Sequence, residues 1–251
     1  IGLDSSGSLF GQSLLNAGVT PNLLTTSTHT SLLLSMVTPD GERTMLCCLG
    51  AAHELKAEEL TAQLFADVTH VHLDGYSFYI PGITFKTIER AQKAGATISL
   101  DLSSFEVVRL FKSEIESLLT GKVDVVFANE EEAYELTGLP PREACMQLQK
   151  QCKIAVVHIG KEGCWVGSND VVFQAKPPKV TVIDTLGAGD LFASGFLYGW
   201  LHHMQLQECA RIGNLLGSAC VQTQGAAIPD FIWAEILPLC QAKTAEISLE
   251  K

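Results

Sequence analysis

Three small residues stand directly before an acid in the stretch Asp184-Thr185-Leu186-Gly187-Ala188-Gly189-Asp190-Leu191-Phe192. Because Gly187, Ala188 and Gly189 carry little or no side chain, an anion can approach their backbone N–H groups closely. The residues that follow predict a helix from about Leu191 to His203, and the positive end of its dipole would point at the same place. A turn of this kind is typical of a site that handles phosphoryl groups.

Asp190 needs a separate explanation, because a carboxylate is unfavourable where an anionic phosphate binds unless it has a chemical task. Accepting the proton of an attacking hydroxyl would be such a task. We therefore interpret Asp190 as a general base beside an anion hole. The alternative is a tight turn in which Asp190 only caps the helix, as aspartate often does, and this stretch alone leaves both open. Phe192 replaces the glycine of a dinucleotide fingerprint, and the chain has no P-loop motif.

Composition limits the class of protein. The 251 residues provide one ample core, or a core with a small appendage, and 47% hydrophobic with 18% charged residues fits a compact soluble domain. No apolar run reaches the roughly 18 residues of a membrane span, and the start lacks a basic signal segment, so we expect no membrane association. With 17 basic against 28 acidic residues and a net charge of -11, nucleic acid is excluded as a partner.

The eight cysteines contain no Cys-x-x-Cys pair and are too sparse for a disulfide framework. We interpret them as free thiols of an intracellular protein in a reducing compartment. The chain begins at Ile1 instead of a methionine, and we expect that residues before Ile1 have been lost.

Alternating apolar and helical patterns predict a parallel α/β architecture. A β-hairpin is expected over 30–50, turning at Pro39-Asp40-Gly41, and a second over 163–175. From Gly189 onward the pattern is almost wholly helical. The expected strands are 69–73, 97–102, 123–128 and 154–159, and the expected helices between them are 81–94, 105–119 and 130–151, the last broken at 138–141. This alternation predicts right-handed crossovers and a sheet covered on both faces.

Polar residues follow several predicted strands, where ligands bind in such sheets. Asp74, Asp101, Asn129 and Gly160 all fall at these ends. In Asn129-Glu130-Glu131-Glu132 the residues can simply cap a helix and satisfy its dipole. The functional alternative is that Asn129 and Glu132 hold Mg²⁺ or its waters. His70 and His72 project to the same side of a strand, but no third zinc ligand is evident.

Together these segments resemble the ribokinase-like (PfkB) family of carbohydrate and nucleoside kinases. Asp184-Thr-x-Gly-Ala-Gly-Asp190 is similar to the family's C-terminal signature, and Asn129-x-x-Glu132 to its metal-associated motif. Asp40-Gly41-Glu42-Arg43-Thr44 resembles the β-lid, and Gly50-Ala51-Ala52 the segment that returns from it. The resemblance implies a three-layer α/β/α sandwich with a mostly parallel sheet. It also implies one kinase domain over 1–251, incomplete at its N-terminus, in which 30–50 contribute to a β-hairpin lid.

The resemblance also implies a role for each matching position. Asp190 corresponds to the catalytic base and Gly187, Ala188 and Gly189 to the anion hole. Asn129 and Glu132 correspond to residues that bind Mg²⁺ and phosphate, and an ATP pocket is implied at Lys161, Gly163, Asn214 and Gly225 together with Asn129. Asp184 and Leu186 correspond to a K⁺ site. Asp74 and Arg43 correspond to residues that contact the acceptor. A homodimer through the lid is left open.

Two features of the family pattern bear on the acceptor. Family members begin with a strand that carries an acceptor-binding aspartate, followed by a Gly-Gly segment, and neither precedes Gly2, so we expect about the first quarter of the pattern to be absent. The segments 72–76, 100–105 and 127–130 are similar to those of adenosine kinases, which favours phosphorylation of the primary hydroxyl of a nucleoside. A sugar kinase of the same family and a catalytically silent nucleotide-binding fragment are the alternatives.

Overall fold

The computed structural model describes residues 1–37 and 43–241. The chain divides into two compact units, one of residues 1–66 and 77–90 and the other of residues 67–76 and 91–251. The larger unit holds the main sheet and most of the predicted site residues.

The larger unit is built on a six-stranded sheet in the order β3-β4-β5-β6-β7-β8. Neighbouring strands run parallel from β3 to β6 and antiparallel from β6 to β8. The strands are β3 (His70–Asp74), β4 (Thr97–Asp101), β5 (Val125–Asn129), β6 (Ile154–His158), β7 (Cys164–Ser168) and β8 (Val171–Ala175). The structure thus confirms the four predicted parallel strands and the second hairpin. This hairpin turns at Asn169 and Asp170, whose φ angles of 49° and 62° suit its two-residue turn.

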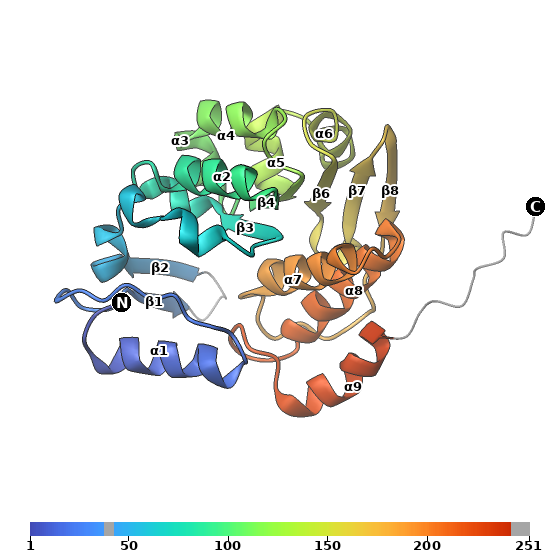
Figure 1. Ribbon diagram of the computed structural model, residues 1–251. Helices are drawn as coiled ribbons and strands as arrows, with labels where there is room; N and C mark the ends of the chain where they lie inside the picture. The colour runs from blue at the N-terminus through green and yellow to red at the C-terminus, as the bar shows by residue number, and fades with distance from the viewer. Residues whose placement is uncertain (38–42, 242–251) are drawn as a thin grey trace, which may run out of the picture. The chain divides into compact units, whose positions relative to one another are not determined.

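Helices cover both faces of this sheet (Figure 1). On one face lie α3 (Phe105–Leu110), α4 (Lys112–Leu119), α5 (Glu130–Thr137) and α6 (Pro141–Leu148), and on the other α7 (Ala188–Leu201) and α8 (Leu206–Cys220). The first four residues of β5 are all buried, as expected for a strand covered on both sides. Phe127 of β5 packs at its edge against Phe196 of α7, with ring centroids 5.6 Å apart. The predicted three-layer sandwich is confirmed.

Helix boundaries differ from the prediction in places. The expected break at 138–141 is present, because Gly138 ends α5 with a φ of 72° and Pro141 begins α6. The single helix predicted over 105–119 is wrong, since the backbone leaves helical geometry at Phe111 (φ −121°, ψ 26°) between α3 and α4. The C-terminal region contains α7, α8 and α9 (Asp230–Gln241). No helix in the described ranges is long and apolar enough to cross a membrane.

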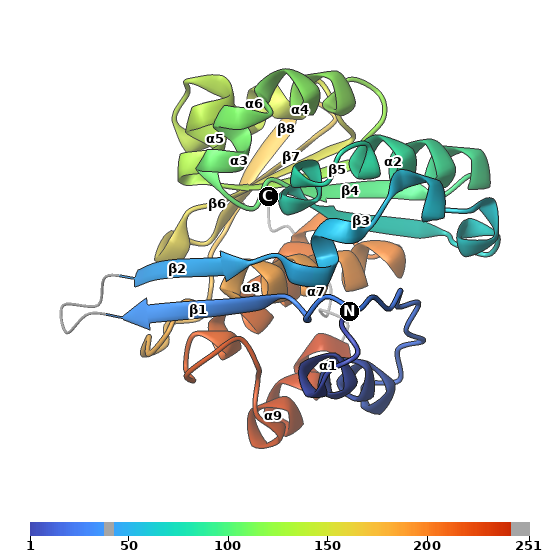
Figure 2. The same ribbon diagram turned by 90° about the vertical axis from the view of Figure 1, so that its left-hand side faces the viewer.

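The smaller unit contains the predicted first hairpin. Strands β1 (Leu32–Val37) and β2 (Arg43–Cys48) pair antiparallel, from Leu32 opposite Cys48 to Val37 opposite Arg43 (Figure 2). The predicted turn at 39–41 lies outside the described residues. An unpredicted helix, α1 (Ser5–Asn16), begins after Asp4, whose carboxylate accepts a hydrogen bond from Gly7 N–H. Short 3₁₀ turns follow the hairpin at Gly50–Glu54, Ala57–Glu59, Ala62–Phe65 and Gly75–Tyr79, and α2 (Ile83–Ala94) leads from this unit into the larger one.

Candidate active site

The Gly-Ala-Gly-Asp turn forms the start of α7. Gly187 is the N-cap with a φ of 75°, and a Cβ at this position would lie 2.6 Å from the Cβ of Ala226. Both facts require glycine here. The helix begins at Ala188, three residues before the predicted start. Asp190 is therefore the third helical residue, and the alternative in which it caps the helix is wrong.

The start of α7 can accept an anion. Ala188 N–H donates to Thr185 O at 3.3 Å, and Leu191 N–H donates to Gly187 O at 2.9 Å. The first N–H groups of a helix have no acceptor within the helix itself, and they lie at the positive end of its dipole. Gly189 is exposed, and a Cβ there would meet nothing within 4 Å, so its backbone is open to a ligand.

Three aspartates from different elements gather near this helix start. Burial, together with the negative charges of Asp190 and Asp74, raises the pKa of Asp101, at the end of β4, to about 6. Asp101 Oδ1 accepts a hydrogen bond from Ser103 N–H at 2.8 Å. Asp74 and Asp190 are exposed. Asp74, Asp190 and Asp101, which the sequence places at a predicted strand end, are thus brought to one edge of the sheet.

Asn129 and Glu132 form a reciprocal cap at the start of α5. Asn129 Oδ1 accepts from Glu132 N–H at 2.8 Å, while the Glu132 carboxylate accepts from Asn129 N–H at 2.8 Å and from Asn129 Nδ2 at 2.7 Å. The capping interpretation of this motif is therefore confirmed. Glu132 is only 3% exposed. Burial is the main cause that raises its pKa to about 8, and the negative charge of Asp101 contributes to this value.

These carboxylates bear on the predicted Mg²⁺. No group of three or more histidine, cysteine, aspartate and glutamate side chains stands ready to hold a metal ion in the part of the chain that the structure describes. The polar side-chain atoms of Asn129 and Glu132 are engaged in hydrogen bonds within the cap. The two residues therefore fit contact with the water ligands of a hydrated Mg²⁺ better than direct coordination of the ion. The closeness of the buried Glu132 to Asp101 fits this, because a divalent cation would compensate both charges.

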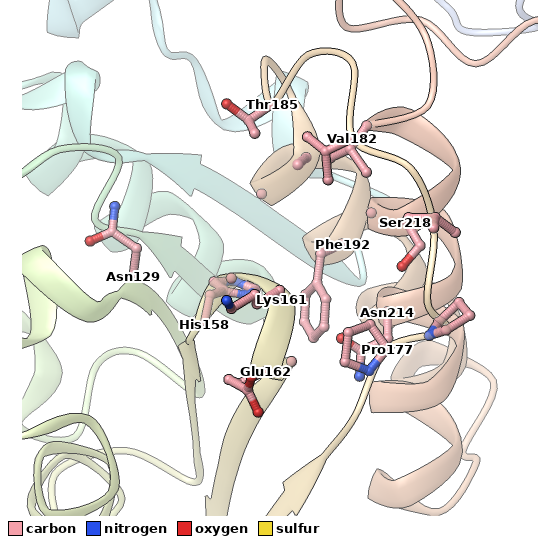
Figure 3. Close-up of a pocket in the computed structure, with 18 of the residues that line it drawn as sticks. Asn129, His158, Lys161, Glu162, Pro177, Val182, Thr185, Phe192, Asn214 and Ser218 are labelled. Atoms are coloured by element: carbon pink, nitrogen blue, oxygen red, sulfur yellow. The ribbon is translucent and has the colours of Figure 1, made fainter. Parts of the chain in front are cut away.

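A cavity of about 990 Å³ lies beside the start of α7 (Figure 3). Ala188 and Gly189 line it at one side, and Asn129, Lys161, Gly163 and Asn214 also line it. Four of the predicted ATP-pocket residues therefore surround one space together with part of the predicted anion hole. Figure 3 shows Asn129 at the end of β5, Lys161 in the β6–β7 turn and Asn214 on α8.

The remaining predicted residues lie elsewhere. Gly225 is not among the residues that line the cavity. Its N–H donates to Asp184 Oδ2 at 3.0 Å, and Asp184 Oδ1 accepts from Leu186 N–H at 3.0 Å. Asp184 thus ties the turn before α7 to the loop after α8. Arg43 is the first residue of β2 and belongs to the smaller unit.

Several residues that line the cavity are not among the predicted site residues. They include the loop residues 177–180, 182 and 185, and also His158, Phe192 and Ser218. Burial lowers the pKa of His158 to about 4, and its ring packs at the edge of Phe192 with centroids 4.3 Å apart. Among the described atoms, its Nε2 has no hydrogen-bond partner. The sequence Lys176-Pro177-Pro178-Lys179 was a usable signal, because paired prolines stiffen a loop beside a ligand.

The histidine pair on β3 is satisfied without a metal. His70 Nε2 and His72 Nδ1 lie 2.9 and 2.8 Å from Ser99 Oγ, and His70 Nδ1 lies 2.9 Å from Thr97 Oγ1. The two rings do project to the same side, as the strand period predicts.

Glu132 gives this site a testable pH dependence. Its folded pKa of about 8 exceeds the ordinary 4.5, so the folded chain keeps a proton that the unfolded chain releases between these values. The stability that this proton contributes is complete below about pH 4.5 and is lost as the pH rises through about 8, with a limiting slope of about 1.4 kcal/mol per pH unit. Glu132→Gln keeps the cap but does not titrate. We expect its unfolding free energy to vary less over this range than that of the wild type.

Urea unfolding at several pH values measures this difference. Asp101 is present in both proteins, so the difference between the two curves reports Glu132 together with its electrostatic coupling to Asp101. Parallel curves of unfolding free energy against pH for the two proteins would contradict the assignment of the raised pKa to Glu132.

Known proteins resemble this chain in sequence and fold. The crystal structure of a probable sugar kinase from Rhizobium etli is 30% identical with a TM-score of 0.88, over 95% of this chain and 75% of that one. The structure of adenosine kinase from Sinorhizobium meliloti is 29% identical with a TM-score of 0.86, over 95% and 76%. A ribokinase of Arabidopsis thaliana is 25% identical over 92% of this chain.

The chain spans 63% of the length of that ribokinase. The profile of the pfkB family carbohydrate kinases matches residues 1–232. With the shared fold and the signature around Asp190, this match shows that the chain belongs to the pfkB family of carbohydrate kinases.

Proposed function

We propose that this chain is an ATP-dependent kinase that transfers the γ-phosphoryl group to a primary hydroxyl. The observation that carries the proposal is the start of α7, where Ala188 and Gly189 line the large cavity and Asp190 follows without serving as the cap. ATP would occupy the cavity with its phosphates at the N–H groups of Gly189 and Ala188, and Ala188 N–H would exchange its 3.3 Å hydrogen bond with Thr185 O for one with a phosphate oxygen. Asp190 would then accept the proton of the attacking hydroxyl.

The catalytic demands of this reaction suit such a site. Phosphoryl transfer passes through a loose transition state, so the protein chiefly positions the reactants and stabilises charge. Donors of an anion hole contribute on the order of 10²–10³ in rate, and a general base on the order of 10²–10⁴. The N–H groups of Ala188 and Gly189 and the carboxylate of Asp190 would supply these two contributions.

The acceptor that we propose is a purine nucleoside, phosphorylated at its 5′-hydroxyl. The likeness to an adenosine kinase that is 29% identical supports this class. A sugar is the second candidate, supported by the 30% identity to a probable sugar kinase. ATP consumption measured against a panel of nucleosides and sugars separates the two.

A third outcome of the same panel would reject kinase activity. If ATP raises the melting temperature but no acceptor causes ATP consumption, the chain binds nucleotide without catalysing transfer. That result would leave the ATP pocket in place and overturn the role of Asp190.

Mg²⁺ bound with ATP would supply positive charge that compensates the charge developing on the phosphates. We propose that Asn129 and Glu132 hold the waters of this ion. For Glu132→Gln we expect a higher Mg²⁺ concentration at half-maximal rate, because an amide attracts a hydrated cation less than a carboxylate does. An Mg²⁺ titration of the ATPase or kinase rate checks this. The role fails if wild type and variant titrate alike.

Two further features belong to the proposal. K⁺ would bind beside Asp184 and Leu186, where the aspartate already accepts hydrogen bonds from backbone groups of two loops.

A homodimer through the lid is supported by the exposed apolar side chains of β1 and β2, namely Leu32, Leu33, Leu34, Met45 and Leu46.

A further inference from the structure

Cys48 and His29 form a pair in the smaller unit. Cys48 is the last residue of β2, and His29 precedes β1. The Sγ atom of Cys48 lies 3.7 Å from Nε2 of His29, within hydrogen-bond distance for sulfur. Both residues are exposed. A thiol and an imidazole from two separate segments thus meet at a surface that small molecules can reach.

The hydrogen bonds of His29 fix the role of each ring nitrogen. Nδ1 lies 3.0 Å from the carbonyl oxygen of Thr30, which can only accept, so Nδ1 carries the proton. In the neutral ring, Nε2 therefore presents its lone pair to Cys48, and the S–H group donates to it. This is the arrangement in which an imidazole can take the proton of a thiol.

The surrounding backbone holds the imidazole in place. His29 O accepts from Ala51 N–H at 2.8 Å. Gly50 has a φ of 48°, and a Cβ there would lie 2.8 Å from His29 Nδ1, so only glycine leaves room for the ring. Thr30 N–H donates to Asp4 at 2.7 Å, which anchors the carbonyl partner of the ring. The pair is therefore a defined local structure.

We propose that Cys48 is a site of thiol–disulfide exchange with low-molecular-weight disulfides, and that His29 accepts its proton. In this step the thiol proton moves to Nε2, and the Cys48 sulfur attacks one sulfur of the small disulfide. A new S–S bond forms, the old one breaks, and the second sulfur leaves as a thiolate that takes the proton from the imidazolium. Cys48 is oxidised to a mixed disulfide, and the small disulfide is reduced to one free thiol.

The chain provides a matched control in Cys47. It is adjacent to Cys48 on the same strand and is also exposed. Because successive side chains of a strand point to opposite faces, Cys47 projects away from the face that meets His29. Cys145, Cys164, Cys209, Cys220 and Cys240 are buried, so they react slowly while the chain stays folded. Cys152 is half-buried, burial raises the pKa of its thiol to about 12, and it is present in both variants of the test, so it contributes equally to both.

The test compares Cys47→Ser, which keeps Cys48, with Cys48→Ser, which keeps Cys47. The probe is 5,5′-dithiobis(2-nitrobenzoate), a small disulfide that releases a coloured thiolate, and oxidised glutathione is used with mass detection as the second probe. Near neutral pH we expect Cys48 to react about tenfold faster or more than Cys47. Adding His29→Gln to the Cys47→Ser protein should remove most of this advantage.

Equal rates for the two cysteines, or a Cys48 rate that His29→Gln leaves unchanged, would overturn the proposal. An unfolded His29→Gln protein would reveal itself by rapid reaction of the buried thiols. In that case the Cys47→Ser and Cys48→Ser proteins decide by themselves. A Cys48 rate about tenfold above that of Cys47 supports the pair, and equal rates reject it.

Discussion

Asp190→Asn is expected to reduce kcat by about 10²–10⁴ while leaving the affinity for ATP nearly intact. The carboxylate is exposed and does not cap α7, so its replacement by an amide of the same shape should not disturb the helix. The amide cannot accept the proton of the attacking hydroxyl. The nucleotide, in contrast, would be held by the cavity and by the N–H groups of Ala188 and Gly189, which the variant keeps.

The measurement combines steady-state kinetics with ATP binding followed by calorimetry. Asp170→Asn is the matched control, because it makes the same change at an exposed position in the β7–β8 turn, where asparagine tolerates the φ of 62°. This control should keep wild-type kcat. Retention of more than about a tenth of kcat by Asp190→Asn would refute the assignment of the base.

The sheet could be predicted from the sequence because its strands are covered on both faces. Val125, Val126, Phe127 and Ala128 form an unbroken apolar run, and all four are buried in β5. The second hairpin could also be predicted, because its turn residues Asn169 and Asp170 adopt the positive φ angles that these residue types tolerate.

Other elements carried weaker signals. The break between α3 and α4 occurs at Phe111, where the sequence has neither glycine nor proline. The start of α7 was placed at Leu191 because Gly187, Ala188 and Gly189 suggest a loop, although a glycine N-cap lets the helix begin at Ala188. This small error had a large consequence, since it left open whether Asp190 is a cap.

The sequence motifs of the candidate site could be predicted, but some of the residues that line its cavity could not. Asn129, Lys161, Gly163 and Asn214 do surround one cavity, as the resemblance implied. The loop of residues 177–185 also lines it, and neither apolar periodicity nor a turn pattern fixes where such a loop runs. Gly225, in contrast, was predicted to belong to the ATP pocket but does not line the cavity, and its N–H donates a hydrogen bond to Asp184.

Gly163→Ala is expected to have the largest effect on stability among single changes at the cavity. Gly163 has φ 93° and ψ −121°, a conformation closed to residues with a Cβ, and a Cβ there would lie 1.9 Å from the carbonyl oxygen of Ala175. That oxygen belongs to the last residue of β8 and also accepts from Asn214 Nδ2 at 3.2 Å. The methyl group must therefore displace β8, the β6–β7 turn or both, at a cost of more than about 3 kcal/mol.

Gly160→Ala tests whether this cost comes from the clash. Gly160 opens the same turn and also has a positive φ, 51°, but a Cβ there would meet nothing within 4 Å. Alanine can adopt this left-handed geometry at about 1–2 kcal/mol. Urea unfolding should thus separate the two variants by at least about 1 kcal/mol. Equal losses would mean that β8 yields easily. In that case the backbone between Gly163 and Asn214, which forms one wall of the cavity, would be displaced at little cost, and the same displacement would be open to it when ATP binds.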